Sequence, residues 1–140
     1  MITYVDTSVL IKIIIDEAGS EQAELIWDVA DELATARILY AEARAALAAG
    51  ARSGRLTAGN HGKAVAGLET LWTQMTIAEI TDGLVRRAAD LAEEHALRGY
   101  DAVHLAAALL VGADVLTSAD AQLCAAALNA GLHVANPTVA

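Results

Sequence analysis

The sequence has few of the residues that mark secreted, membrane-spanning or disulfide-rich proteins. Its one cysteine, Cys124, excludes an internal disulfide and a cysteine-rich zinc site, which favours a reducing, cytoplasmic setting. No uncharged stretch reaches the roughly 20 residues needed to span a bilayer, and no secretory signal pattern opens the chain. We therefore expect a cytoplasmic protein with no membrane partner.

Aromatic and basic residues are scarce as well. Phenylalanine is absent and aromatic residues make up 4% of the 140 residues, whereas 56% are hydrophobic and about a quarter are alanine. With only 19% charged residues, the chain is too apolar and too weakly charged to be disordered. Nine basic and eighteen acidic residues give a formal charge of −9, the opposite of what binding to nucleic acid through bulk positive charge requires. A polyanion must be bound locally or through a cation.

Short apolar segments alternate with helical patterns along the chain, whose length allows one domain over residues 1–140. Strands are expected at 2–5, 33–35, 76–80, 115–117 and 132–135. Helices are expected at 9–15, 21–31, 38–51, 57–74, 82–97, 100–111 and 119–129, with Gly99 ending the helix at 82–97. This alternation predicts an α/β sandwich with a mainly parallel sheet of short strands.

Four acidic residues are expected to meet at one edge of this sheet. Asp6 and Asp120 follow strands, and parallel sheets bind ligands beyond the carboxyl ends of their strands. Glu42 and Asp101 lie on stripes of apolar and small residues in their helices. Because converging carboxylates repel one another, the cluster would take up protons or hold cations, and oxygen ligands suit Mg²⁺ or Mn²⁺. One or two such ions can activate water against a phosphodiester, so the pattern indicates phosphate-ester chemistry.

Four sequence blocks resemble those of a known family. They are Val-Asp-Thr-Ser-Val-Leu at 5–10, Ala-Glu-Ala-Arg-Ala-Ala-Leu at 41–47, Arg-Gly-Tyr-Asp-Ala-Val-His-Leu-Ala-Ala-Ala at 98–108 and Leu-Thr-Ser-Ala-Asp-Ala-Gln-Leu at 116–123. In this order and in a chain of this length, they resemble the PIN-domain ribonucleases, especially the VapC-like toxins of prokaryotic toxin–antitoxin pairs. Residues 48–80 match the family only in general character.

The resemblance implies a PIN-domain fold, a three-layer α/β/α sandwich with a central sheet of about four or five strands. It also implies an endoribonuclease toxin that uses Mg²⁺ or Mn²⁺, with a metal-activated water attacking the RNA phosphodiester. The family's catalytic and metal-binding quartet maps onto Asp6, Glu42, Asp101 and Asp120. A VapB-like antitoxin and a second copy in a homodimer are the implied protein partners.

Several further residues have candidate roles. Ser8 and Ser118 match polar positions near the family's metal site. Arg98 and Arg44 could contact RNA phosphate, although such arginines more often pair with neighbouring carboxylates. His104, one turn from the third acid, is interpreted as a satisfied core histidine rather than a ligand.

The early helices offer a candidate surface for a partner or a second copy. Apolar residues that are expected to be exposed lie there near Leu25, Ile26 and Trp27. We expect this region to contact an antitoxin or to form part of a dimer.

Other functions were weighed against the nuclease. Alternatively, Asp6, Asp101 and Asp120 merely stabilise helix starts, as caps or first-turn residues, without binding a ligand. A haloacid-dehalogenase-type phosphatase would need an aspartate where Ser8 stands, and a response-regulator receiver would need a late lysine that the chain lacks. The remaining alternative is a non-catalytic PIN-fold module that binds proteins, which the presence of all four acids disfavours.

Overall fold

A five-stranded parallel sheet forms the centre of the computed structural model, which describes residues 1–139. The strands are β1 (Ile2–Val5), β2 (Glu32–Ala36), β3 (Thr76–Ala78), β4 (Val115–Thr117) and β5 (His133–Ala135). Their order in the sheet is β3-β2-β1-β4-β5, and each neighbouring pair is parallel. The predicted fold class is confirmed.

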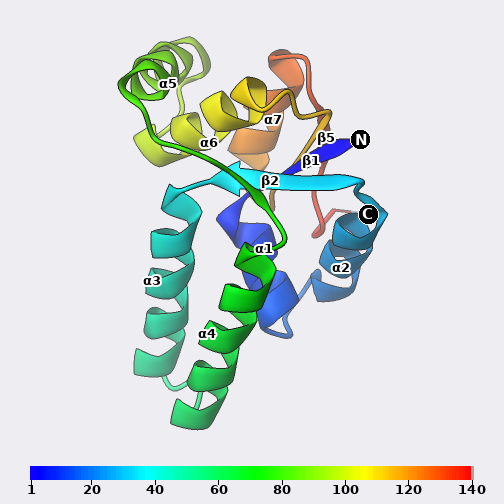
Figure 1. The fold of residues 1–140 in the computed structure, drawn as a ribbon, viewed down its shortest axis with the longest axis vertical. Coiled ribbons are helices and arrows are strands. Elements are labelled where there is room, and N and C mark those ends of the chain that lie inside the picture. Colours follow the sequence, from blue (N-terminus) through cyan, green and yellow to red (C-terminus); the bar gives the residue numbers. More distant parts are fainter. Residues whose placement is uncertain (140) are drawn as a thin grey trace.

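Helices cover both faces of the sheet and give three layers (Figure 1). They are α1 (Thr7–Ile14), α2 (Ser20–Val29), α3 (Ile38–Arg52), α4 (Ala58–Trp72), α5 (Asp82–His95), α6 (Gly99–Leu110) and α7 (Ala121–Asn129). The first four lie on one face, and α5, α6 and α7 lie on the other. Within the described residues, no helix combines the length and apolar character needed to cross a bilayer.

The direction of chain winding reverses beside β1. From β1 the chain proceeds outward to β2 and β3, and then crosses back over the opposite face to place β4 against the other side of β1. Val5 and Thr117 are partners in the register of this pair, and the Asp6 amide donates to the Thr117 carbonyl at 3.0 Å. The carboxyl ends of β1 and β4 therefore form a switch point, the position where open α/β sheets bind ligands.

Two apolar clusters fill the space between the layers. Tyr4 belongs to the cluster under α5, α6 and α7, whereas the next residue, Val5, belongs to the cluster under α1, α3 and α4. Successive residues of a strand point to opposite faces, which is why the short β1 contributes to both. Helix α6 buries four alanines together with Leu105, so it packs closely against the sheet without any phenylalanine. The rigid centre thus holds the end of β1 in place.

Two of the predicted helix starts are confirmed in detail. The Thr57 hydroxyl accepts from the Asn60 amide at the start of α4, and the Thr81 hydroxyl accepts from the Leu84 amide at the start of α5. Both are N-cap contacts that satisfy amides left free in the first turn. Helix α1 begins two residues earlier than predicted because the carbonyl of Asp6 accepts from the amides three and four residues on.

The prediction that Gly99 ends a helix is wrong. Helix α5 ends at His95 because Ala96 adopts a left-handed conformation with φ of 54°, and Gly99 is the first residue of α6. A left-handed alanine is uncommon, which is why glycine is the residue that sequence reasoning predicts as the helix stop. Strand β3 also ends at Ala78, two residues before the predicted end, because its pairing with β2 stops there.

Candidate active site

Asp6 lies at the switch point, directly after β1. It is the N-cap residue of α1 by position, yet its carboxylate makes no capping hydrogen bond. Instead, Oδ2 accepts from the hydroxyls of Ser8 and Ser118, both at 2.7 Å, and the residue is 7% exposed. A buried carboxylate held by two hydroxyls is positioned for something other than helix capping.

The two serine hydroxyls also fix the loop that follows β4. Ser8 Oγ accepts from the amide of Ala119 at 3.0 Å, and Ser118 Oγ accepts from the amide of Asp120 at 3.0 Å. Each hydroxyl therefore donates to Asp6, at the end of β1, and accepts from a backbone amide in the loop after β4. The structure places Ser8 and Ser118 where the sequence predicts them, next to the acids.

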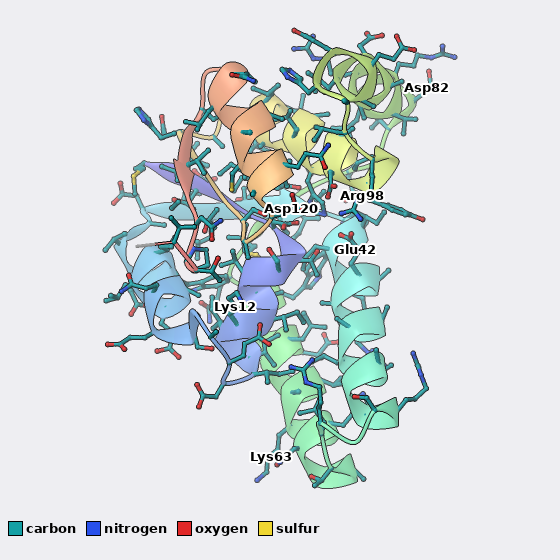
Figure 2. The ribbon with its side chains drawn as sticks, turned by 180° about the vertical axis from the view of Figure 1, so that it is seen from behind. Lys12, Glu42, Lys63, Asp82, Arg98 and Asp120 are labelled. Atoms are coloured by element: carbon teal, nitrogen blue, oxygen red, sulfur yellow. The ribbon has the colours of Figure 1, made fainter. Side chains whose placement is uncertain are left out.

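Arg98 bridges two further acids. Asp120 caps α7 through Oδ1, which accepts from the Leu123 amide at 3.0 Å, and its Oδ2 lies 3.4 Å from Arg98 Nη2. Asp101, in the first turn of α6, accepts from Arg98 Nε through Oδ2 at 3.2 Å. The Arg98 side chain is 77% exposed. Figure 2 shows Arg98 and Asp120 near the middle of the molecule, close to Glu42 in the upper part of α3.

Glu42 reaches the same place from the opposite helical layer. It lies on α3, and its Oε1 accepts from Thr7 Oγ1 at 2.9 Å and from His104 Nε2 at 2.6 Å. The same imidazole nitrogen lies 3.7 Å from Asp6 Oδ1. His104 is 1% exposed, so the expectation of a buried, satisfied histidine is confirmed. Its position between two acids was not predicted, although its spacing of three from Asp101 was a signal.

The local field of the site is strongly negative. Burial raises the pKa of Asp101, and the negative charges of Asp120 and Asp6 add to this rise, while Arg98 only partly offsets it. A carboxyl with a raised pKa is one whose negative charge is poorly compensated. The acids therefore repel one another even with Arg98 in contact.

The contact between Glu42 and His104 favours the charged form of each partner. Burial acts to raise the pKa of Glu42, but the hydrogen bonds from His104 and Thr7 and the charge of His104 outweigh it and lower that pKa. Burial acts in the opposite sense on His104, where the hydrogen bond to Glu42 and the charge of Asp6 prevail and raise the pKa. The site thus stabilises positive charge placed among its carboxylates.

The donor set suits a hard divalent ion. Three acids are each held through one oxygen by a hydroxyl or an amide, namely Asp6 Oδ2, Glu42 Oε1 and Asp120 Oδ1. No hydroxyl or amide among residues 1–139 donates to the second oxygen of these acids. Carboxylate oxygens of this kind are the ligands of Mg²⁺ and Mn²⁺.

The carboxylates are not grouped as a complete set of metal ligands. Among the described residues, no three histidine, cysteine, aspartate or glutamate side chains are placed to hold one metal together. The guanidinium of Arg98 contacts both Asp101 and Asp120. The residues fit a divalent cation in donor type and in charge, because Arg98 only partly offsets the negative charge around Asp101.

Two predicted features lie away from this cluster. Arg44 donates to the Tyr40 hydroxyl at 2.9 Å and stacks over the Tyr40 ring, with 5.7 Å between guanidinium carbon and ring centroid. Its contacts are thus with Tyr40 rather than with the quartet. On α2, Leu25 is 53% exposed, but Ile26 is only partly exposed and Trp27 packs against the apolar core.

A family profile and a similar protein identify the family of this chain. The PIN domain matches residues 3–129. Ribonuclease VapC45 of Mycobacterium tuberculosis is 41% identical over 136 residues, which span 96% of this chain and 94% of that protein. The chain therefore belongs to the PIN-domain family, among its VapC-like ribonucleases, as the sequence blocks predict.

Solved structures show the same fold. The crystal structure of Mycobacterium tuberculosis VapC20, described as a sarcin–ricin loop cleaving toxin, has a TM-score of 0.70 and 20% identity, covering 93% of this chain and 95% of that one. A toxin–antitoxin complex from Klebsiella pneumoniae has a TM-score of 0.67 and 21% identity, covering 96% and 97%. At these identities the matches establish the three-layer architecture.

Proposed function

We propose that the protein is a metal-dependent endoribonuclease that acts as the toxin of a toxin–antitoxin pair. The observation that carries the proposal is the gathering of four acids around the carboxyl ends of β1 and β4: Asp6, Glu42, Asp101 and Asp120. Membership of the PIN-domain family and 41% identity to a ribonuclease support RNA as the substrate. The oxygen donor set supports Mg²⁺ or Mn²⁺ as the cofactor.

The chain's own residues have separable tasks in this activity. A bound Mg²⁺ or Mn²⁺ supplies an activated water and stabilises charge at the phosphodiester. Asp6 directs Oδ1 into the site because Ser8 and Ser118 hold Oδ2. Asp101, on α6, and Asp120, at the start of α7, would hold the cation together with Asp6 and Glu42. The buried side of the cluster excludes bulk water, which strengthens these electrostatic contacts.

Arg98 is the residue that we assign to the RNA phosphate. Its side chain is 77% exposed and touches Asp101 and Asp120 from the solvent side. With Asp101 and Asp120 holding a divalent ion, the Arg98 guanidinium would be free to pair with a phosphate of the substrate instead. Arg44 points at Tyr40, so we give it no part in this contact.

The direct test is cleavage of a cellular RNA pool by purified protein freed of antitoxin. We expect cutting with Mg²⁺ or Mn²⁺, none with EDTA, and a loss of roughly 100-fold or more in Asp6→Asn, a larger effect than loss of an outer partner. Asp82→Asn is the matched control, because Asp82 is an exposed acid on α5 far from the site in Figure 2. No cutting by folded protein under any metal condition would favour the non-catalytic binding module.

The partners follow from the same site. A VapB-like antitoxin with a basic segment would complement a negative cluster in a chain of formal charge −9, and a structural neighbour is itself a toxin–antitoxin complex.

We further propose a homodimer, one domain over residues 1–140 and a cytoplasmic location where RNA is available. Light scattering of wild type and Leu25→Glu tests whether the exposed Leu25 takes part in a dimer.

A further inference from the structure

A buried polar chain crosses from one helical layer of the fold to the other. The Tyr4 hydroxyl of β1 lies 2.7 Å from His104 Nδ1 on α6, and His104 Nε2 lies 2.6 Å from Glu42 Oε1 on α3. Tyr4 is fully buried and His104 is 1% exposed. The two rings meet edge to face with centroids 5.8 Å apart. Neither Tyr4 nor His104 has a role among those proposed for the four acids and Arg98.

Tyr4 and Glu42 together set the orientation and the tautomer of the His104 ring. The Tyr4 hydroxyl can donate to Nδ1 or accept from Nδ1–H, so its contact alone is compatible with every form of the imidazole. The ionised carboxylate of Glu42 can only accept, so its contact with Nε2 selects the forms in which Nε2 carries a hydrogen. In those forms the Tyr4 hydroxyl donates to Nδ1 of the neutral ring or accepts from Nδ1–H of the imidazolium.

This Nε2–H donor and the Thr7 hydroxyl together hold the Glu42 side chain in one orientation. Glu42 is a long side chain with several rotatable bonds, and it enters the site from α3 at the opposite face of the sheet. Oε1 accepts from Thr7 and His104 together, so no described residue is left donating to Oε2. The same nitrogen lies 3.7 Å from Asp6 Oδ1, which places two acids on one imidazole edge.

We infer that His104 is a positioning residue of the acidic site, oriented by Tyr4, which holds Glu42 so that its second oxygen faces the cation. The inference rests on the proposed metal-dependent function and extends it to residues outside the quartet. Partners of this kind, which orient ligands from behind, alter metal affinity or activity by about 10–100-fold when they are removed.

Two amide variants separate positioning from simple packing. His104→Asn places its amide near the Nδ1 position, where it reaches Tyr4 but is too short for Glu42. His104→Gln places its amide near the Nε2 position and keeps a donor to Glu42. Both leave a neutral amide in the same buried place. Leu91→Ala is the control for stability alone. Leu91 is 2% exposed and belongs to the apolar cluster that contains Tyr4, but it lies on α5.

The measurements are the affinity for Mn²⁺ alone, without RNA, and then kcat and KM for RNA cleavage. We expect His104→Asn to weaken Mn²⁺ binding by about tenfold or more and to lower kcat with little change in KM. His104→Gln recovers most of both losses. Leu91→Ala lowers the melting temperature without changing Mn²⁺ affinity. Equal Mn²⁺ affinities in wild type, His104→Asn and His104→Gln would overturn the inference.

The tautomer is tested by nitrogen-15 NMR of the metal-free protein. We expect Nε2 of His104 to carry a hydrogen, and a ring protonated only at Nδ1 contradicts the inference. A wild-type protein that binds Mn²⁺ but cuts no RNA would refute the proposed function while leaving the Mn²⁺ comparison of the two amide variants intact. A wild-type protein that binds no Mn²⁺ overturns both.

Discussion

The two sides of the acidic site are held by different kinds of partner. On the inner side, Asp6 and Glu42 accept hydrogen bonds from hydroxyls and from a buried imidazole. On the outer side, Asp101 and Asp120 share the guanidinium of Arg98, whose side chain is 77% exposed. Buried donors with satisfied partners are costly to remove once the fold has formed, whereas an ion pair made by an exposed side chain is weak and easily exchanged.

This difference divides the site into a preformed part and an exchangeable part. The inner side is fixed by the end of β1, the loop after β4 and the first turn of α1. The outer side presents the exposed guanidinium of Arg98, which under the proposed function would give way to a divalent ion and pair with RNA. A preformed half and an exchangeable half would together let an acidic protein bind a polyanion without a basic surface.

The largest expected effect comes from removing an outer acid. Asp101→Asn should lower metal-dependent cleavage by roughly 100-fold or more, since it removes a charge that the cation requires. The same change should raise stability at neutral pH. Burial raises the pKa of Asp101, so the ionised form is the less stable one in the folded protein, and stability falls as pH rises through the folded pKa.

Thermal unfolding of metal-free wild type and Asp101→Asn between pH 3 and 8 measures this directly. The stability of the variant should increase relative to that of wild type as the pH rises. The two proteins should be equally stable in acid, where Asp101 is protonated in both folded and unfolded wild type. A variant less stable than wild type at pH 7 would show that the Arg98 contact dominates this carboxylate instead.

An intermediate effect is expected on the inner side. Ser118→Ala removes the donor to Asp6 and the acceptor for the Asp120 amide in a residue that is fully buried. We expect a loss of about 1–3 kcal/mol in stability and about 10-fold or more in cleavage. Ser53→Ala is the control, because the Ser53 hydroxyl donates only to a carbonyl near the end of α3. Denaturant unfolding measures the change in stability, and initial cleavage rates measure the change in activity. A wild-type cleavage rate in Ser118→Ala would mean that Asp6 does not need the hydrogen bond from Ser118.

The smallest effect on stability is expected at Arg98, where Mn²⁺ affinity and RNA cleavage are expected to change in opposite directions. Arg98→Gln should change stability by less than about 1 kcal/mol, because exposed ion pairs contribute little. It should strengthen Mn²⁺ binding by removing a competing cation, and weaken cleavage by removing the phosphate contact. Arg86→Gln is the control for loss of an exposed arginine, since the Arg86 side chain is 79% exposed and pairs with the exposed Asp82. Calorimetric titration with Mn²⁺ that shows weaker binding in Arg98→Gln would exclude exchange at the outer side.

Much of this site could be predicted because its signals are local in sequence. Asp6 and Asp120 follow strands, and the rule for parallel sheets brings such residues to one edge. Glu42 stands among alanines and leucines, where a glutamate needs a partner. Cys124 is buried among the alanines of its helix, and burial raises the pKa of its thiol to about 11.

The rest depended on contacts that sequence spacing does not encode. Tyr4 and His104 are 100 residues apart, and only the packing of α6 over β1 brings them together. Arg44 lies in sequence next to a quartet acid, yet helix geometry turns it toward Tyr40. The end of α5 depends on Ala96 in a left-handed conformation that alanine rarely adopts, so glycine was the better prediction there.

The most direct test of a site with one fixed and one exchangeable side is a crystal structure of the protein with Mn²⁺, read from the anomalous signal of the metal. We predict a manganese peak beside Asp6 Oδ1 and Glu42 Oε2, with Asp101 or Asp120 also in contact and Arg98 turned away from both. The hydroxyl and imidazole contacts of the inner side should be unchanged. A manganese site elsewhere, or Arg98 still bridging Asp101 and Asp120 with Mn²⁺ at saturation, would contradict the account.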